Sequence, residues 1–211
     1  PIFMGEGGEN NILWYTGAFR MFEDLGISWN FWTWKKMETT NSPCSIQMPS
    51  GWQELVRYLE TGSFQSREKV EAALLEYLEN MKVKKCEFHE GVVRSLLRRP
   101  PVTIPAVFYD YTSSGFTASP ASAGDKPKDR PLFRKNDHSD IRYMHPSGQK
   151  PEPNFAHSKG EDWTQEEWLS LVLHPQEKCE YSFHLPRTAG SVVVTMHVKA
   201  MEGDTELRIL D

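Results

Sequence analysis

The chain has 211 residues, 38% of them hydrophobic, and its formal net charge of −5 gives a sequence pI near 5.8. This length suits one mid-sized domain or two small ones, and the acidic balance gives no electrostatic reason to expect nucleic acid as a partner. No apolar run approaches the roughly 20 residues that a membrane span needs, so we expect no membrane partner.

The cysteines and the first residues add two expectations. Cys44, Cys86 and Cys179 lie far apart without a C-x-x-C pair, which predicts neither a metal knuckle nor a disulfide framework. Residues 1–4 lack the basic and apolar regions of a signal peptide, so they indicate no cellular address.

The chain begins with a pattern of strand, helix and strand. Residues 1–5 are a short apolar run, typical of a strand buried on both faces. Asn10 or Asn11 can cap a following helix that ends near Gly26. The apolar positions of this helix recur on one face: Ile12, Tyr15, Phe19 and Phe22. The β-prone segment 27–34 completes a βαβ unit, which predicts a parallel sheet.

Two more helices are predicted before the chain changes character near residue 100. They cover 51–59 and 66–88, and the second has an apolar stripe that predicts core packing: Val70, Ala73, Leu74, Tyr77, Leu78 and Met81. The proline-rich run 96–104 is the predicted hinge between a first half, residues 1–95, and a second half, residues 105–211. The pairs Lys84-Lys85 and Arg98-Arg99 are expected on solvated faces.

Beyond the hinge the hydrophobic period changes to 2. Four strands are predicted, at 166–173, 181–185, 191–200 and 205–210. The intervening segments 119–131 and 145–160 are rich in Pro, Gly and Ser, as loops are. Several short strands with such connections predict an all-β sandwich.

The carboxylate Glu6 follows the first predicted strand and has glycines around it. In an α/β barrel the groups that do chemistry lie at the carboxyl ends of the strands. The second strand ends in Trp32 and Trp34, and a tryptophan face can pack against a sugar ring. A carboxylate there could stabilise the oxocarbenium-like transition state of glycoside hydrolysis, although a solvated loop glutamate is the simpler interpretation of the residues alone.

These segments resemble a known family. "PIFMGEGGE" (1–9) is similar to the seventh barrel strand of family 5 glycoside hydrolases, and "GISWNFWTWKK" (26–36) is similar to their eighth strand. The resemblance implies a (β/α)8 TIM barrel and a retaining hydrolase of β-linked glucan-type, xyloglucan-type or mannan-type polysaccharide. Glu6 matches the nucleophile and Trp32 the tryptophan under the sugar at the cleaved bond. Trp34 takes this place instead if the alignment with the family's eighth strand is shifted.

The chain also departs from that family. The acid/base carboxylate belongs to an Asn-Glu motif on the family's fourth strand, and no segment here matches it or the first six strands. A retaining pair needs two carboxyl groups about 5–5.5 Å apart, and two strands cannot close a barrel. We therefore expect the C-terminal part of a longer enzyme, which should hydrolyse nothing by itself and should leave apolar strand surface exposed.

The second half resembles the β-sandwich carbohydrate-binding modules of the family 6 type. The similarity lies in "LFRKNDHSDIRY" (132–143) and "EDWTQEEWLSLVL" (161–173), and the sandwich is expected to be truncated at its C-terminus. Val107 stands where the modules commonly have a glutamate that helps to hold a structural calcium, so this departure does not carry the calcium site over to the chain. Trp163 is the candidate for sugar stacking, with burial as the open alternative, and Trp168 is expected in the core.

Other sites receive less support from the sequence. The scattered histidines show no metal-ligand spacing, no G-x-S-x-G elbow occurs, and no cofactor is expected. The expected partner is a polysaccharide or oligosaccharide, and an extracellular or periplasmic location follows from the resemblance alone. Two alternatives remain: a non-catalytic glycan-binding protein with a degenerate barrel, and a sandwich that binds no sugar and only braces the barrel.

Overall fold

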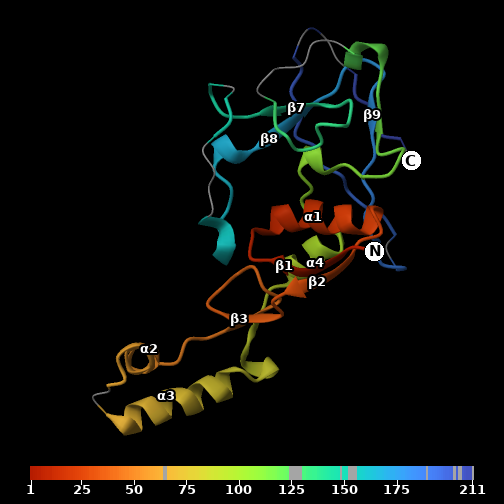
Figure 1. Cartoon of the computed structure of the whole chain (residues 1–211). Helices are drawn as coiled ribbons and strands as arrows, with labels where there is room; N and C mark the ends of the chain where they lie inside the picture. The colour runs from red at the N-terminus through yellow and green to blue at the C-terminus, as the bar shows by residue number, and fades with distance from the viewer. Residues whose placement is uncertain are drawn as a thin grey trace.

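The computed structural model describes residues 1–63, 66–123, 130–147, 149–151, 156–188, 190–201, 203 and 206–210. These residues form a mixed α/β structure with four α-helices and several small sheets (Figure 1). All four helices end before residue 97, and the described residues beyond it contain only short strands and 3-10 turns. The described residues close no barrel and form no clear two-sheet sandwich.

The predicted βαβ unit is confirmed. Strands β1 (Phe3–Gly8) and β2 (Ser28–Trp32) are parallel neighbours, joined by helix α1 (Ile12–Asp24). The side chain of Asn11 caps α1 by accepting a hydrogen bond from the Trp14 amide at 2.9 Å, which satisfies a free helix N–H. The predicted strand 1–5 was placed too early, because β1 continues through Glu6 to Gly8.

Helix α1 covers one face of this two-stranded sheet. Trp29 and Phe31 of β2 point toward α1, where their rings contact Phe19 with centroids 4.7 and 5.8 Å apart. Helix α4 (Glu90–Leu96) lies beside α1 and adds the buried Val92 to this core. The other face of the sheet is open, so the expected exposure of apolar strand surface is confirmed at Phe3.

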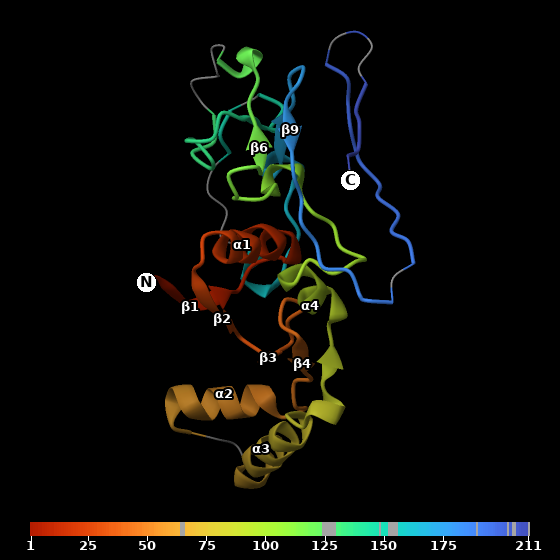
Figure 2. The same ribbon diagram turned by 90° about the vertical axis from the view of Figure 1, so that its right-hand side faces the viewer.

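Helices α2 (Trp52–Thr61) and α3 (Arg67–Asn80) pack on each other and project from the body as an arm (Figures 1 and 2). The prediction of a helix over 66–88 was wrong at its end. A 3-10 turn (Val83–Lys85) and strand β5 (Glu87–Phe88) follow α3, because β5 pairs with a neighbouring strand.

The partner of β5 is β4 (Cys44–Ile46), which also pairs with β3 (Lys35–Met37). The predicted core stripe of α3 is only partly correct. Val70 and Ala73 are buried, whereas Leu74 and Leu78 stay exposed because α2 covers only part of α3.

The second half consists of short strands and single turns. Strand β6 (Phe116–Thr117) pairs with β9 (Lys178–Cys179), and β7 (Asp140–Tyr143) pairs with β8 (Leu169–Val172), both antiparallel. Its core contains the buried side chains of Val107, Phe108 and Ile141. Four 3-10 turns connect these elements: Ala106–Phe108, Pro120–Ala123, Ala156–Lys159 and Gln165–Glu167.

Three predicted strands are wrong. Residues 181–185, 190–201 and 206–210 contain no helix or strand, and Asp204 and Thr205 lie outside the described residues. The segment after 190 runs as an extended trace along the edge of the molecule (Figure 2), with its alternating apolar side chains exposed: Val192, Val194, Met196 and Val198. The period-2 pattern indicated an extended backbone, but a strand also needs a partner.

The two halves meet across α1, which lies between β1–β2 and the second half in both views (Figures 1 and 2). Arg98, expected on a solvated face, is instead only 3% exposed. Its guanidinium donates to the Thr16 carbonyl of α1 at 2.8 Å and to the Phe108 carbonyl at 2.7 Å. It also forms an ion pair with the buried Asp110 at 3.1 Å. The hinge therefore holds the halves together through a buried charge.

No helix in the described ranges is both long and apolar enough to cross a membrane. The peptide bonds Trp32–Thr33 and Pro100–Pro101 are cis.

Candidate functional site

Glu6 lies in a bulge of β1. Met4 pairs with Trp29 and Gly7 pairs with Phe31, so two residues, Gly5 and Glu6, oppose the single residue Asn30. Bulges re-aim side chains and are common beside active sites. The Glu6 side chain is exposed and makes no hydrogen bond or ion pair with the residues that the structure describes. It is therefore available to a ligand.

The tryptophans at the end of β2 are also accessible. Trp32 pairs with Gly8 at the carboxyl end of the two strands and is 49% exposed, and Trp34 is 57% exposed. In β2 the half-buried Trp29 and Phe31 alternate with exposed residues, so Trp32 points away from α1. Trp32 therefore lies at the carboxyl end of β2, whereas Glu6 lies two residues before the end of β1 and opposite Asn30. Both side chains are exposed on neighbouring parallel strands.

The lysines that follow β2 have structural partners. Lys36 forms an ion pair with Glu9, and the Lys35 ammonium group donates to the Met81 carbonyl at 2.5 Å. These contacts tie the segment after β2 to the loop after β1 and to the arm. Glu9 therefore has a structural partner in Lys36, whereas Glu6 has none among the described residues.

Asn41 organises the loop after β1, although the sequence pattern did not indicate it. The side chain of Asn41 is buried, and its amide donates to the Asn10 carbonyl at 3.0 Å. Its own carbonyl accepts a hydrogen bond from the Tyr15 hydroxyl at 3.0 Å. The pKa of the Tyr15 hydroxyl is raised to about 12, chiefly by burial, so the hydroxyl stays protonated and can donate at neutral pH. No motif marked Asn41, because its partners lie up to 117 residues away.

The second half reaches the same region. The second N–H of the Asn41 amide donates to the Ser158 carbonyl at 2.9 Å, and the Thr40 amide donates to the Lys159 carbonyl at 3.4 Å. The turn Ala156–Lys159 lies beside the N-terminal end of α1 (Figure 1). The Asn41 amide therefore links the loop after β1 to the second half.

Trp163 is packed rather than freely presented. Its half-buried ring lies against the core of the second half, 6.2 Å from the Phe108 ring and 5.4 Å from the Trp168 ring between centroids. Trp168 is likewise half-buried. This packing favours the burial alternative for Trp163. Trp168 contacts the Trp163 ring but is not part of the buried cluster of Val107, Phe108 and Ile141 in which it was expected.

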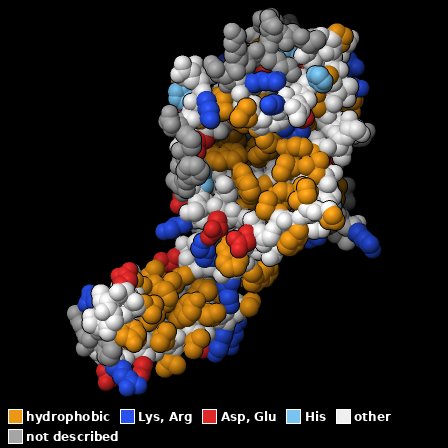
Figure 3. Space-filling view, in the orientation of Figure 1, with side chains coloured by type: hydrophobic (Ala, Val, Ile, Leu, Met, Phe, Trp, Pro, Cys, Tyr) orange, Lys and Arg blue, Asp and Glu red, His pale blue; other side chains and the backbone are white. Residues whose placement is uncertain are grey.

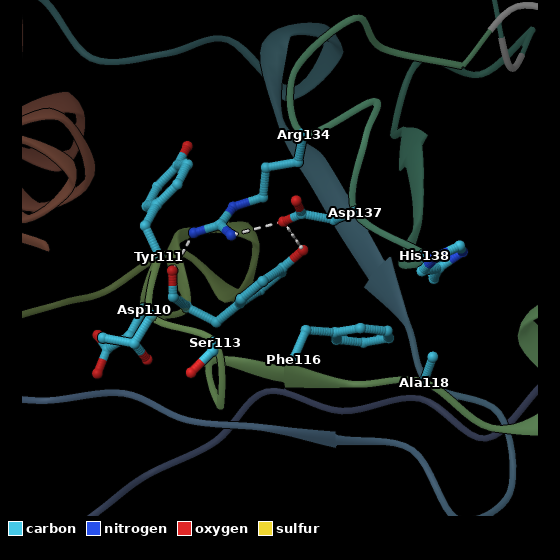
Figure 4. Close-up of a pocket in the computed structure, with 10 residues that line it drawn as sticks. Asp110, Tyr111, Ser113, Phe116, Ala118, Arg134, Asp137 and His138 are labelled. Atoms are coloured by element: carbon cyan, nitrogen blue, oxygen red, sulfur yellow. Dashed lines mark hydrogen bonds and ion pairs between the residues drawn. The ribbon is translucent and has the colours of Figure 1, made fainter. Parts of the chain in front are cut away.

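A separate cavity of about 190 Å³ opens in the second half (Figure 4). Its wall contains the Arg134 guanidinium, which is stacked 3.6 Å from the ring centroids of both Tyr109 and Tyr111. Arg134 donates to Asp137 at 2.8 Å, and Asp137 also accepts from the Tyr109 hydroxyl at 2.8 Å. The pKa of the Tyr109 hydroxyl is raised, chiefly because the side chain is buried.

The rest of this cavity combines an aromatic side chain with polar groups. Phe116 lies on one side, and Asp137 and the exposed His138 lie on another (Figure 4). The two bonds to Asp137 use one carboxylate oxygen, and the other accepts no hydrogen bond from the residues that the structure describes. Since pockets for drug-sized ligands span about 300–1,000 Å³, this smaller cavity suits a single ring-sized group.

Within the described ranges, no three His, Cys, Asp or Glu side chains are grouped to hold a metal ion, and the three cysteines are free. The comparisons with known proteins add no relative. No protein-family model, curated protein or solved structure matches this chain.

Proposed function

We propose that the chain supplies the nucleophile and one sugar platform of a retaining β-glycoside hydrolase of the family 5 type. Glu6 would attack the anomeric carbon, forming a glycosyl-enzyme bond as the aglycone oxygen leaves with a proton from an acid/base carboxyl. Water would then release the sugar with its configuration retained. The substrate is a β-linked polysaccharide, and the acid/base and six further strands come from elsewhere in a longer polypeptide.

One observation supports the proposal: Glu6 is an exposed carboxylate in a strand bulge with no partner among the described residues, and the neighbouring parallel strand ends in an exposed tryptophan. Glu6 makes no contact with described residues that would give it a structural role. Trp32 exposes about half of its surface although it is a large apolar side chain. A structural tryptophan would be expected in a core, whereas a sugar platform must face solvent.

The test uses the full-length polypeptide that carries this sequence, assayed on β-glucan, xyloglucan, xylan and β-mannan. Glu6→Gln keeps the size of the side chain but removes its charge, so activity should fall by about 10³-fold or more. Glu9→Gln is the matched control, because Glu9 lies three residues away and is committed to Lys36. Its activity should stay within about threefold of the wild-type value.

Chemical rescue identifies the role of Glu6 more sharply. In Glu6→Ala, azide can occupy the vacated space and attack an activated aryl β-glycoside, and the product should be the α-glycosyl azide. A β-configured azide would instead assign Glu6 to the acid/base position. Full activity of Glu6→Gln on every polymer would remove Glu6 from the chemistry.

A second candidate function, glycan binding by the second half, is favoured by the cavity beside Phe116. A sugar ring could lie on Phe116 while its hydroxyls donate to the other carboxylate oxygen of Asp137. Phe116→Ala should weaken retardation in gels that contain the bound polymer, and Phe183→Ala, at an exposed aromatic residue, is the control. Equal retardation of both variants would exclude this cavity.

A further inference from the structure

The second half contacts the loop that follows Glu6 through one buried amide. The side chain of Asn41 has two N–H groups, and both are used, one on the Asn10 carbonyl and one on the Ser158 carbonyl. The Tyr15 hydroxyl donates to the Asn41 carbonyl and accepts from the Asn10 amide at 3.3 Å. Asn10 is therefore held at both its amide and its carbonyl, two residues beyond the end of β1.

The segment of the second half that meets Asn41 is itself fixed. The two ring nitrogens of His157 are bonded to the Glu161 carbonyl at 2.9 Å and to the Glu167 carboxylate at 2.7 Å. Gly160 has φ +98°, and a β-carbon there would lie 2.8 Å from the Thr40 hydroxyl. Only glycine allows this close approach.

The contact continues along α1. A β-carbon on Gly17 would lie 2.5 Å from the Phe108 ring, so a core side chain of the second half sits directly on the helix backbone. Farther along, the Asp24 carboxylate accepts from the Tyr111 amide at 2.7 Å. A module that is joined to the first half only by a flexible linker would need neither contact.

From these contacts we infer that Asn41 and residues 157–160 are positioning elements for Glu6, which makes the second half an integral part of the catalytic unit. This inference rests on the proposed function, because it assigns the role of these contacts to the chemistry at Glu6. The loop that they hold begins directly after the bulged strand. Displacement of a reacting group by about 1 Å can cost about 100-fold in rate.

The test is Asn41→Asp in the full-length polypeptide, because aspartate keeps the shape and loses both N–H donors. Asn80→Asp is the matched control, since Asn80 also donates one side-chain hydrogen bond, to the Gln47 carbonyl in the arm at 3.0 Å. With 4-nitrophenyl β-cellobioside, or the aryl glycoside of whichever polymer is cleaved, kcat of Asn41→Asp should fall by about tenfold or more, with little change in KM. Asn80→Asp should retain the wild-type kcat.

Hydrogen–deuterium exchange supplies a second measurement that does not depend on activity. Asn41→Asp and Gly160→Ala should both speed exchange over residues 5–11, and Asn80→Asp should not. The inference is overturned if exchange over 5–11 is unchanged, or if it rises while kcat stays at the wild-type value. If the wild-type protein or Glu6→Gln shows that the proposed hydrolase function is wrong, exchange still decides whether Asn41 holds this loop.

Discussion

Arg98 and Arg99 are neighbours in the chain, yet they lie in opposite environments. Arg99 is exposed, whereas Arg98 donates to carbonyls of both halves and pairs with Asp110. Burial lowers the pKa of Arg98 to about 10, which leaves it charged at neutral pH. Asp110 compensates this charge and also faces Arg20 at 3.4 Å. A buried charge of this kind costs little only while its partners stay in place.

Arg98→Met should therefore destabilise the protein by about 3–5 kcal/mol, because it leaves the buried Asp110 without its main partner. Arg99→Met removes the same charge at the neighbouring exposed position and should change the unfolding free energy by less than about 0.5 kcal/mol. Urea denaturation of the two variants measures both values. Similar small effects in both would mean that Arg98 is solvated after all.

The pair formed by His157 and Glu167 makes stability depend on pH. Burial opposes the charged form of His157, but the hydrogen bonds and charges of Glu167 and Glu161 outweigh it and raise the His157 pKa above its ordinary 6.5. A raised pKa in the folded state gives stability that is complete below pH 6.5 and is lost as the pH rises through the folded-state pKa. Glu167 is half-buried, and burial tends to raise its pKa, but the hydrogen bond with His157 and the bonds from Thr164 outweigh this and lower the pKa below the ordinary 4.5. Its contribution is present above pH 4.5 and is lost as the pH falls through the lowered pKa.

The melting temperature of wild type relative to His157→Gln should thus be highest between about pH 4.5 and 6.5 and should decline toward pH 9. His197→Gln, at an exposed histidine, is the control and should show no such difference. A wild-type advantage that grows with pH would contradict the assigned charge state.

At the scale of elements, α1 shows what a sequence can and cannot predict. Its cap, its apolar face and its βαβ connection were predicted because they depend on residues close in sequence. The strand at 191–200 was not correctly predicted, because alternation determines an extended conformation while pairing depends on distant residues. The burial of Arg98 and the role of Asn41 were missed for the same reason, since their partners lie 82 and 117 residues away.

Gly17 gives a prediction about α1 in which two physical effects oppose each other. Alanine favours a helix interior over glycine by about 0.5–1 kcal/mol. At Gly17, however, the added methyl group would overlap the Phe108 ring, and overpacking costs about 1–3 kcal/mol. Gly17→Ala should therefore lower the unfolding free energy.

The same substitution in a Phe108→Ala background should raise the unfolding free energy by about 0.5–1 kcal/mol, because the ring is gone and only the helix preference remains. Urea denaturation of the four proteins in this cycle tests the reversal of sign. Stabilisation by Gly17→Ala in both backgrounds would mean that Phe108 does not rest on the helix.

For the molecule as a whole, the distribution of apolar surface is uneven. In the view of Figure 3, hydrophobic side chains gather over the α2–α3 arm and again between α1 and the β7–β8 strands. Leu59 and Leu75 of the arm are 71% and 68% exposed, and Phe3 of β1 is 64% exposed. Surface of this kind is normally covered by another part of a protein.

The 211-residue chain by itself should therefore bind the apolar dye ANS and associate with rising concentration, and the longer polypeptide that we propose should do neither. Dye fluorescence and sedimentation velocity measure the two effects. Phe3→Ser should reduce dye binding by the isolated chain, whereas Ser28→Ala, at an exposed position of the neighbouring strand, should not. A monomeric isolated chain without dye binding would contradict the idea that strands from elsewhere cover β1 and β2.

The close approach of Phe108 to Gly17 also bears on how such a protein can change over evolutionary time. A second half that rests on a helix backbone cannot be exchanged between proteins by recombination at residues 96–104 alone. The recipient must already have a glycine at the matching turn of its helix and an asparagine at the position of Asn41, which bonds to the 157–160 turn. Inheritance of the second half is thereby linked to Gly17 and Asn41 of the first half, although residues 96–104 separate the two halves in the sequence.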